Sequence, residues 1–349
     1  MRKNIALFMA MFLIIAMLTS CAPAAAPAAP AAPAAPAEPA APAEPAAPAE
    51  PAAPAEPAAP AVEAGPIVVA FVSANFNDTG QVFIKDGAKA KAEELGMVFK
   101  EADAQEDVIK QQDLVQAYIT EKVDVLIVVP VSTDAMDPII QAGKDAGIPV
   151  VFVNRNPFGT SMPPEGTYYV GSEELVAGQQ QGEYLGKVAG ETGGNAFVLQ
   201  GKLDNEAAIK RTEGFVKTIE EKFSNIKIVD TQVGNWQRDQ AVTITENWLT
   251  AYGDDINFIV ANNDEMALGA IEALQKAGRT DVIVLGVDFT PDAKDAIKEG
   301  KMIGSVRQDL AGQGAGGVQI AFNLFNGGQK DNPVWIPFVL ITAEDVDKY

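Results

Sequence analysis

The sequence predicts an α/β protein of two similar lobes, each built on a parallel β-sheet. From residue 66 onwards, short β-branched runs bounded by turns alternate with amphipathic helical stretches, which is typical of βαβ units. Runs such as VDVLIVV and VIVLGV are apolar throughout, as expected of strands that helices cover on both faces. The expected strands are too many for one comfortable open sheet, so we expect the chain to change lobe near residues 171–173.

In the first lobe, the β-branched runs predict the strands and the amphipathic stretches between them predict the helices. The strands are expected at residues 67–73, 97–101, 123–130, 149–154 and 168–170. The helices are expected at residues 82–95, 109–121 and 136–146.

The second lobe repeats this alternation. Its strands are expected at residues 195–200, 226–231, 256–261, 282–287 and 302–306. Its helices are expected at residues 175–189, 206–221, 237–251, 267–277 and 291–299.

A glycine-rich stretch from Gly312 to Gly317 follows the second lobe and matches the G-x-G-x-x-G pattern of dinucleotide-binding turns. That pattern belongs at the first strand–helix turn of its fold, whereas here it lies late in the chain with no clear strand after it. We therefore interpret it as close helix packing near a crossover between the lobes.

The first twenty residues predict an export signal, because Arg2 and Lys3 precede a short apolar run that ends in LTSC. The run is too short for a comfortable transmembrane helix. A cysteine at the first mature position, Cys21, resembles the acylated cysteine of bacterial lipoproteins, although an ordinary signal with a chance cysteine is the alternative. Residues 1–20 are thus expected to be a lipoprotein signal peptide.

Residues 21–65 are expected to form a tether from the lipidated cysteine. They are almost entirely Ala, Pro and Glu and repeat the hexamer PAAPAE, so they cannot build a core and favour an extended polyproline II chain. At about 3.1 Å per residue, forty such residues would reach at most roughly 120 Å from a membrane.

The composition excludes several kinds of chemistry. The chain has no histidine and a single cysteine, so we do not expect Ser-His-Asp or Cys-His catalysis, disulfides or His-based zinc sites. It also lacks a D-x-[DN]-x-[DN]-G calcium loop. With 47 acidic and 26 basic side chains, the formal net charge of −21 argues against nucleic acid and anionic lipid as partners.

Polar side chains follow most of the predicted strands in both lobes. Ligands of open parallel sheets bind beyond the carboxyl ends of the strands. Amides, carboxylates and guanidinium groups together donate and accept hydrogen bonds as hydroxyl groups require. The pattern predicts a polyhydroxylated ligand between the lobes, although each Asn or Asp taken alone equally suits a helix N-cap. The residues are Asn75, Asn77, Asp78, Asn154, Arg155, Asn262, Asn263, Asp264, Asp288, Arg307, Gln308 and Asp309.

Trp236 lies on a polar loop, where a tryptophan serves either as a packing anchor or as a flat platform for a ligand. A sugar ring presents an apolar C–H face that stacks on an aromatic side chain while its hydroxyl groups meet polar residues. Arg211 lies in the first turns of an expected helix, and alone it suggests only surface charge.

Five stretches together identify a family: Lys85-Asp86-Gly87, residues 124–130, residues 149–154, ANNDEMALGAIEAL and GVDFTPDA. With them the domain resembles, along nearly its whole length, bacterial type I periplasmic sugar-binding proteins, particularly the galactose/glucose and ribose receptors. The resemblance implies two Rossmann-like lobes joined by a three-segment hinge that closes on one sugar. It assigns residues 66–172 and 309–338 to the N-terminal lobe, and residues 173–308 and 339–349 to the C-terminal lobe.

The resemblance also implies a ligand site. Motif by motif, it implies a polar contact after the first strand from Asp78 and a polar pair after the fourth strand from Asn154 and Arg155. It implies that Arg211 is the clamping arginine and Trp236 the stacking aromatic. The contacts it implies from the C-terminal lobe and hinge are Asn263, Asp288 and Gln308.

Three departures from the family pattern leave the sugar unidentified. Gly80-Gln81 stands where an N-lobe aromatic normally stacks, so Phe76, Phe83 or a hydrogen bond from Gln81 is expected to replace it. Asn205 stands near the position of the galactose/glucose receptor's histidine, and that receptor's calcium loop is missing.

The leading hypothesis is therefore a monomeric, lipid-anchored, extracytoplasmic receptor that delivers a monosaccharide to an ABC permease, with no cofactor, no metal and no nucleic acid. A receptor for a sugar, polyol or nucleoside that feeds a chemotaxis or signalling partner is the alternative. A repressor would need a DNA-binding segment and a basic face. A glycosidase would need paired carboxylates, for which Asp78 and Asp288 are the candidates, but binding of neutral hydroxyl groups explains them without catalysis.

Overall fold

The computed structural model describes residues 65–328 and 331–349. The expected signal peptide, Cys21 and nearly all of the expected tether lie outside the described residues. Within the described part, no helix is both long enough and apolar enough to cross a membrane.

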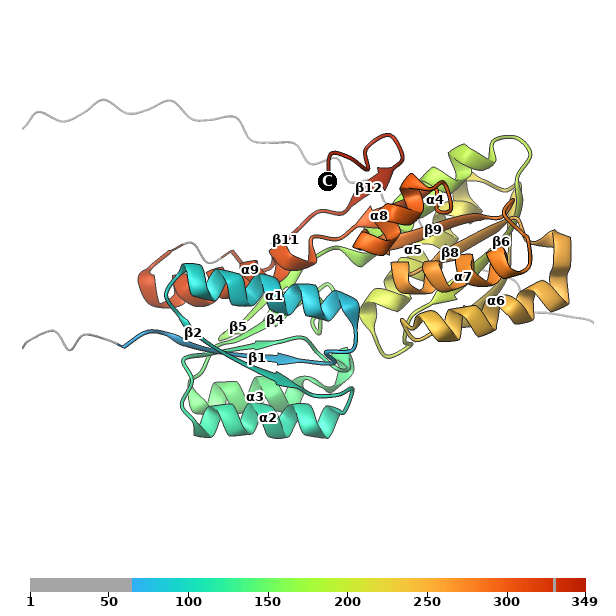
Figure 1. Ribbon diagram of the computed structural model, residues 1–349. Coiled ribbons are helices and arrows are strands. Elements are labelled where there is room, and N and C mark those ends of the chain that lie inside the picture. The colour runs from blue at the N-terminus through green and yellow to red at the C-terminus, as the bar shows by residue number, and fades with distance from the viewer. Residues whose placement is uncertain (1–64, 329–330) are drawn as a thin grey trace, which may run out of the picture. The chain divides into compact units, whose positions relative to one another are not determined.

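The first lobe contains a six-stranded sheet whose described pairings are all parallel, in the order β11-β5-β4-β3-β1-β2. Helices α1 and α9 cover one face of it, and α2 and α3 cover the other (Figure 1). The strands are β1 (Val68–Ser73), β2 (Val98–Asp103), β3 (Val125–Val128), β4 (Val150–Val153), β5 (Thr167–Gly171) and β11 (Val334–Trp335). The helices are α1 (Thr79–Glu94), α2 (Val108–Thr120), α3 (Asp137–Ala146) and α9 (Leu310–Asn326), with a short 3₁₀ turn at Thr133–Ala135.

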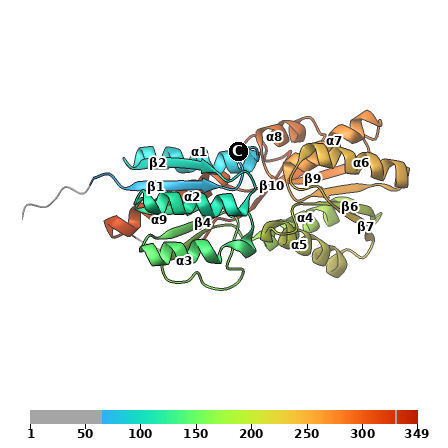
Figure 2. The same ribbon diagram turned by 90° about the horizontal axis from the view of Figure 1, so that it is seen from below.

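The second lobe contains another six-stranded sheet, in the order β12-β10-β9-β8-β6-β7, in which only β12 is antiparallel to its neighbour. Helices α4 and α5 cover one face, and α6, α7 and α8 the other (Figure 2). The strands are β6 (Gly194–Gln200), β7 (Ile226–Val233), β8 (Phe258–Ala261), β9 (Ile283–Asp288), β10 (Gly304–Arg307) and β12 (Val339–Thr342). The helices are α4 (Glu174–Ala189), α5 (Glu206–Lys222), α6 (Arg238–Tyr252), α7 (Asp264–Lys276) and α8 (Pro291–Lys298), with a 3₁₀ turn at Gly253–Asp255.

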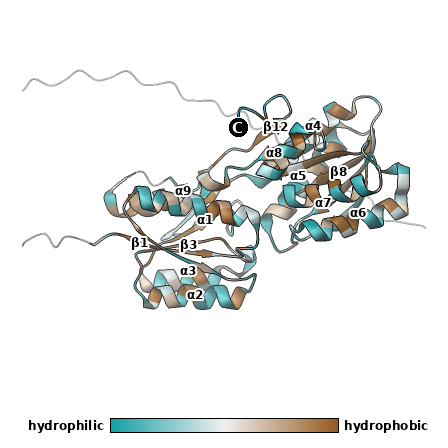
Figure 3. Ribbon diagram, viewed as in Figure 1, coloured by the Kyte–Doolittle hydropathy of each residue, from teal (hydrophilic) through white to brown (hydrophobic). Residues whose placement is uncertain are grey.

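The chain passes between the two sheets three times: from β5 to α4, from β10 to α9, and from β11 to β12. The central strands are buried on both faces by these helices, and they are largely hydrophobic in Figure 3. The predicted two-lobed α/β fold with mostly parallel sheets is confirmed.

Some predicted boundaries were wrong, for local reasons. Helix α1 begins at Thr79 rather than residue 82 because Asp78 caps it, accepting hydrogen bonds from the Gly80 and Gln81 amides. Helix α7 likewise begins at Asp264 rather than residue 267, capped by Asn263. Strands β11 and β12 were not expected at all, because they are short and are held by partners far away in the sequence.

The glycine-rich stretch is part of α9 and packs tightly on α1, as expected. A Cβ atom on Gly314 would lie 1.9 Å from the Ile84 carbonyl oxygen, and one on Gly87 would lie 2.2 Å from that of Ala311. Helices α4 and α5 meet in the same way, since a Cβ atom on Gly178 would lie 1.9 Å from the Arg211 carbonyl oxygen. This second contact fixes the backbone that carries Arg211.

Candidate functional site

All nine residues predicted from the sequence to touch the ligand line one cavity of about 40 Å³ between the lobes, which we call the inner cavity. The first lobe contributes residues from the loops after β1 and β4 and from the first turn of α1. The second contributes residues from α5, from the loops after β7 and β8 and from the end of β9, and the crossing segment after β10 adds one more. The nine residues are Asp78, Gln81, Asn154, Arg155, Arg211, Trp236, Asn263, Asp288 and Gln308.

On the first-lobe side, Asp78 and Arg155 form a charged pair, with 3.6 Å between the Asp78 Oδ2 and the Arg155 Nη2 atoms. The opposite Arg155 nitrogen donates to the Pro130 carbonyl oxygen at 2.9 Å, so the guanidinium is held in place. Asp78 Oδ1 is used by the α1 cap, at 2.9 Å from the Gly80 amide. Its Oδ2 accepts from Gln81 Nε2 at 3.2 Å, and its remaining lone pair can accept from a ligand hydroxyl group.

On the second-lobe side, Arg211 is only 4% exposed and is held by three partners. Its Nε donates to Glu174 Oε2 at 2.6 Å, and its Nη1 to the Asn262 carbonyl oxygen at 2.7 Å. The third, Gln308 Oε1, accepts from Nη2 at 3.2 Å. A buried arginine fixed in this way presents its remaining N–H groups in one direction.

Asp288 lies 3.8 Å from Arg211 Nη1, an ion-pair distance but too long for a hydrogen bond. Burial raises the pKa of Asp288 well above its usual range, and the neighbouring Asp264, Asp78 and Glu174 carboxylates act in the same direction, against Arg211. Hydroxyl donors from a ligand would favour its charged form.

Trp236 forms the wall beside Arg211, whose guanidinium carbon lies 5.8 Å from the indole centroid. The indole Nε1 donates to Asn205 Oδ1 at 3.0 Å, and the Trp236 carbonyl accepts from Asn263 Nδ2 at 3.3 Å. A Cβ atom on Gly201 would lie 2.2 Å from the ring, so a larger residue there would displace the indole. The indole is thus held at its edge by Asn205, while Arg211 lies over the ring.

Three of the nine residues use much of their hydrogen-bonding capacity within the protein. Gln81 Oε1 accepts from Ser73 Oγ at 2.6 Å and from two backbone amides, and its Nε2 donates to Asp78 Oδ2 at 3.2 Å, so one N–H of its NH₂ group is left for a ligand. Asn154 Nδ2 donates to Gln313 Oε1 at 2.9 Å. Gln308 bridges Arg211 and Glu174.

Sequence reasoning missed Glu174 and Gln313, which hold other residues of the site in place through hydrogen bonds. Glu174 is buried, accepts from Arg211 and Gln308, and carries no signal in the sequence because it stands at the start of an ordinary amphipathic helix. Gln313 joins Asn154 to Ser172 Oγ, at the first crossing between the lobes.

Other polar strand-end residues have structural partners instead. Asp264 is fully buried and accepts from Ser305 Oγ at 2.7 Å and from the Thr290 amide at 2.8 Å, while burial raises its pKa to about 7. Asn262 Oδ1 accepts from the Gly201 amide and Thr212 Oγ1. The Arg307 guanidinium lies over the Tyr349 ring.

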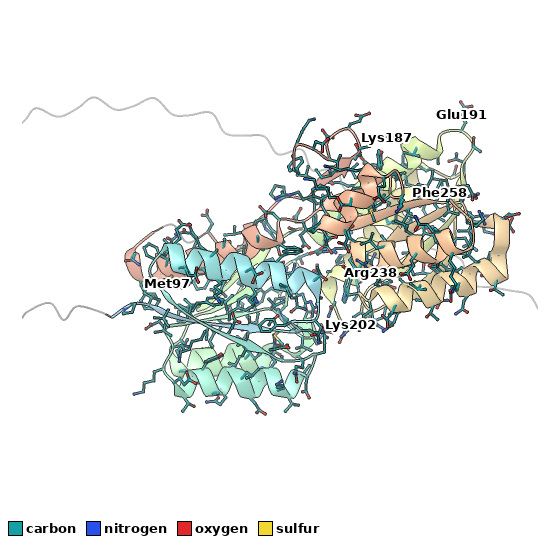
Figure 4. The ribbon with its side chains drawn as sticks, in the orientation of Figure 1. Met97, Lys187, Glu191, Lys202, Arg238 and Phe258 are labelled. Atoms are coloured by element: carbon teal, nitrogen blue, oxygen red, sulfur yellow. The ribbon has the colours of Figure 1, made fainter. Side chains whose placement is uncertain are left out.

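A larger cavity of about 350 Å³, which we call the outer cavity, lies beside the inner one and shares Asp78 and Trp236 with it. Two polar contacts join the lobes along its wall. Lys202 pairs with Glu106, and Thr79 Oγ1 donates to Glu265 Oε1 at 3.4 Å. Lys202 lies where the second lobe meets the first (Figure 4).

The inner cavity therefore offers donors, acceptors and an aromatic face to a small hydroxylated molecule. Among residues 65–328 and 331–349, no group of three or more His, Cys, Asp or Glu side chains is arranged to hold a metal ion. No histidine or thiol nucleophile lines either cavity.

Known proteins resemble this chain over most of its length. It is 38% identical to a putative rhizopine-binding protein of Rhizobium meliloti over 79% of this chain and 90% of the relative. It is 34% identical to a xylitol-binding protein of Mycolicibacterium smegmatis, over 76% of this chain and 75% of the relative.

A solved structure is also similar to this chain. An ABC transporter solute-binding protein from Bacillus halodurans C-125, with bound myo-inositol, is 37% identical and superposes with a TM-score of 0.75 over 82% of this chain and 97% of that one. These relatives are binding proteins, in line with the expectation that the chain is not an enzyme. Since the periplasmic binding protein domain model also matches residues 68–330, the chain belongs to the periplasmic binding protein family.

Proposed function

We propose that the chain is an extracytoplasmic receptor that binds one monosaccharide or polyol in the inner cavity and delivers it to an ABC permease. One observation carries the proposal: two guanidinium groups, two carboxylates and an indole ring converge on a single cavity between the lobes. Each guanidinium group has a carboxylate partner, Asp78 for Arg155 and Glu174 for Arg211, which favours a neutral ligand rich in hydroxyl groups.

Relatives narrow the choice of ligand. The names and bound molecules of similar proteins include xylitol, ribose and myo-inositol, all of them polyhydroxylated. We propose the same chemical class for this chain.

Binding should be coupled to hinge motion. The residues that line the inner cavity come from both lobes, so we propose that a sugar enters when the lobes separate. The ligand then bridges groups from both lobes and favours the closed arrangement. We propose that the permease recognises the closed form.

The test is a calorimetric titration of the purified protein with myo-inositol, xylitol, D-ribose, D-galactose and D-glucose, followed in parallel by tryptophan fluorescence. We expect one of them to bind at micromolar concentration and to change the fluorescence. The change should disappear in Trp236→Phe and persist in Trp248→Phe, because Trp248 is buried in the core of the second lobe. If none of the five binds, the sugar assignment fails.

Cys21 is proposed to anchor the receptor to the membrane by lipid. The cysteine directly follows the predicted signal, and the Ala/Pro/Glu segment after it is suited to hold the lobes away from the bilayer. We expect Cys21→Ala to move the protein from the membrane fraction to the soluble extracytoplasmic fraction. Membrane retention of this variant would contradict lipid anchoring.

A signalling role is the second candidate, because the same closed form can be presented to a chemotaxis or kinase partner. Deleting the gene distinguishes the two. Loss of ligand uptake with an intact response to the ligand favours transport, whereas loss of the response with intact uptake favours signalling.

A further inference from the structure

A third cavity, of about 850 Å³, is lined by residues of both lobes and of the first crossing segment. It shares no lining residue with the inner or the outer cavity. Its walls are the loop after β4, the first crossing into α4, the start of α5, and the segment around β11. We call it the crossover cavity; its volume is within the range of small-molecule sites.

One side of the crossover cavity is apolar. Tyr169 and Trp335 pack edge to face there, with 5.4 Å between ring centroids. Trp335 is 44% exposed and Met162 in the facing loop is 69% exposed, so apolar surface is available to a ligand. An aromatic or aliphatic body would bury this surface.

The other side is acidic. Glu173, Glu174 and Glu206 line it, with Lys210 as the basic side chain among the lining residues. Glu174 is already engaged, since its two oxygens accept from Arg211 and Gln308. Glu206 is different: its Oε2 is buried and finds no hydrogen-bond partner among the described residues.

An unpartnered buried carboxyl group is costly, and Glu206 reduces that cost by holding a proton. Burial raises its pKa to about 8, and Glu174 adds to the rise, against Arg211 and Lys210. A cation paired with the accessible side of the Glu206 carboxyl group, which lines the cavity, would let that group ionise. An anion would be disfavoured, because three carboxyl groups line this side of the cavity.

We propose that the crossover cavity is a second binding site, which takes a small organic amine with an apolar, aromatic body, its ammonium group pairing with Glu206. The apolar body lies against Trp335, Tyr169 and Met162. This site is separate from the proposed sugar site and does not depend on it.

The test uses three matched probes: 2-phenylethylamine, neutral 2-phenylethanol and anionic phenylacetate. Titrated calorimetrically into the purified protein at neutral pH, the amine should bind roughly tenfold or more tightly than the alcohol, and the acid least tightly. In Glu206→Gln, which keeps the side chain's shape, the advantage of the amine over the alcohol should vanish. Glu221→Gln, an exposed substitution on the same helix, should bind the amine as the unmodified protein does.

Two controls keep the result interpretable. Circular dichroism and thermal unfolding establish that Glu206→Gln is folded. The variant Asp288→Ala, altered in the inner cavity only, should retain amine binding, which separates this site from the sugar site. The proposal is overturned by equal amine affinity in the unmodified protein and Glu206→Gln, by loss of amine binding in Asp288→Ala, or by no amine binding at millimolar concentration.

Discussion

At the scale of single residues, the arginines of the inner cavity are held differently from Asp288. Arg155 and Arg211 are held by backbone carbonyls and carboxylates, so their geometry is set before any ligand arrives. Asp288 lies 3.8 Å from its nearest cation, Arg211, which is too long for a hydrogen bond. We therefore expect its carboxyl group to bond a ligand.

We accordingly expect Asp288→Ala to weaken ligand binding by about 2–5 kcal/mol, because buried hydroxyl groups and the Arg211 guanidinium lose a partner. Calorimetric titration with the ligand found in the screen measures the change. Asp254→Ala, which removes a fully exposed carboxylate of the same lobe, is the matched control and should bind normally. Unchanged affinity in Asp288→Ala would remove Asp288 from the site.

The raised pKa of Glu206 predicts how the free energy of unfolding depends on pH. Its pKa is raised to about 8 in the folded protein, chiefly by burial and next by Glu174, whereas it is near 4.5 when unfolded. Between these values the folded state binds one more proton than the unfolded state, so rising pH lowers the free energy of unfolding, by up to about 1.4 kcal/mol per pH unit. Arg211 and Lys210, which face the same carboxyl group, act against the shift.

Denaturant unfolding between pH 5 and pH 8 measures this contribution, as the difference between the unmodified protein and Glu206→Gln. The stability of the unmodified protein should fall more steeply with pH than that of the variant. Parallel pH profiles would show that Glu206 is already ionised in the folded protein.

At the scale of secondary-structure elements, the sequence predicted most of the fold, because strand and helix patterns are local. It could not predict that one residue would serve two purposes. Asp78 and Asn263 each cap a helix and also line the inner cavity, so the cap interpretation is confirmed and the ligand interpretation stays a prediction. Glu174 was missed because only the tertiary fold brings α4 against Arg211.

The contact between α1 and α9 shows why glycine recurs in α9. Gly314→Ala should lower the free energy of unfolding by roughly 1–3 kcal/mol, because its Cβ would lie 1.9 Å from the Ile84 carbonyl oxygen and the helices must move apart. This outcome runs against helix propensity, which favours alanine by about 1 kcal/mol.

Denaturant unfolding measures the effect, and Phe325→Ala, at an exposed position of the same helix, is the comparison. We expect that control to change the free energy of unfolding by about 0.5 kcal/mol or less. A Gly314→Ala variant as stable as the unmodified protein would show that the helices adjust without cost.

At the scale of the whole folded region, the lobes meet through few polar contacts besides the three crossing segments. Lys202 with Glu106, Thr79 with Glu265, and Asn205 Nδ2 with the Val131 carbonyl oxygen join them along the cavities. Contacts made only when the lobes are together add directly to the free energy of closure. The ion pair is partly buried, with side-chain exposures of 24% and 22%.

Lys202→Ala should therefore weaken ligand binding by about 0.5–1 kcal/mol, although Lys202 does not line the inner cavity. The dissociation constant should rise as salt screens the pair in the unmodified protein, and less so in the variant. A double-mutant cycle with Glu106→Gln isolates the coupling between the two side chains.

Lys222→Ala is the control, because Lys222 pairs at 2.7 Å with Glu183 inside the second lobe, and that pair is the same in any hinge position. If Lys202→Ala and Lys222→Ala bind ligand equally well, the ion pair between Lys202 and Glu106 does not stabilise the closed arrangement. The crossing segments alone would then set the hinge equilibrium.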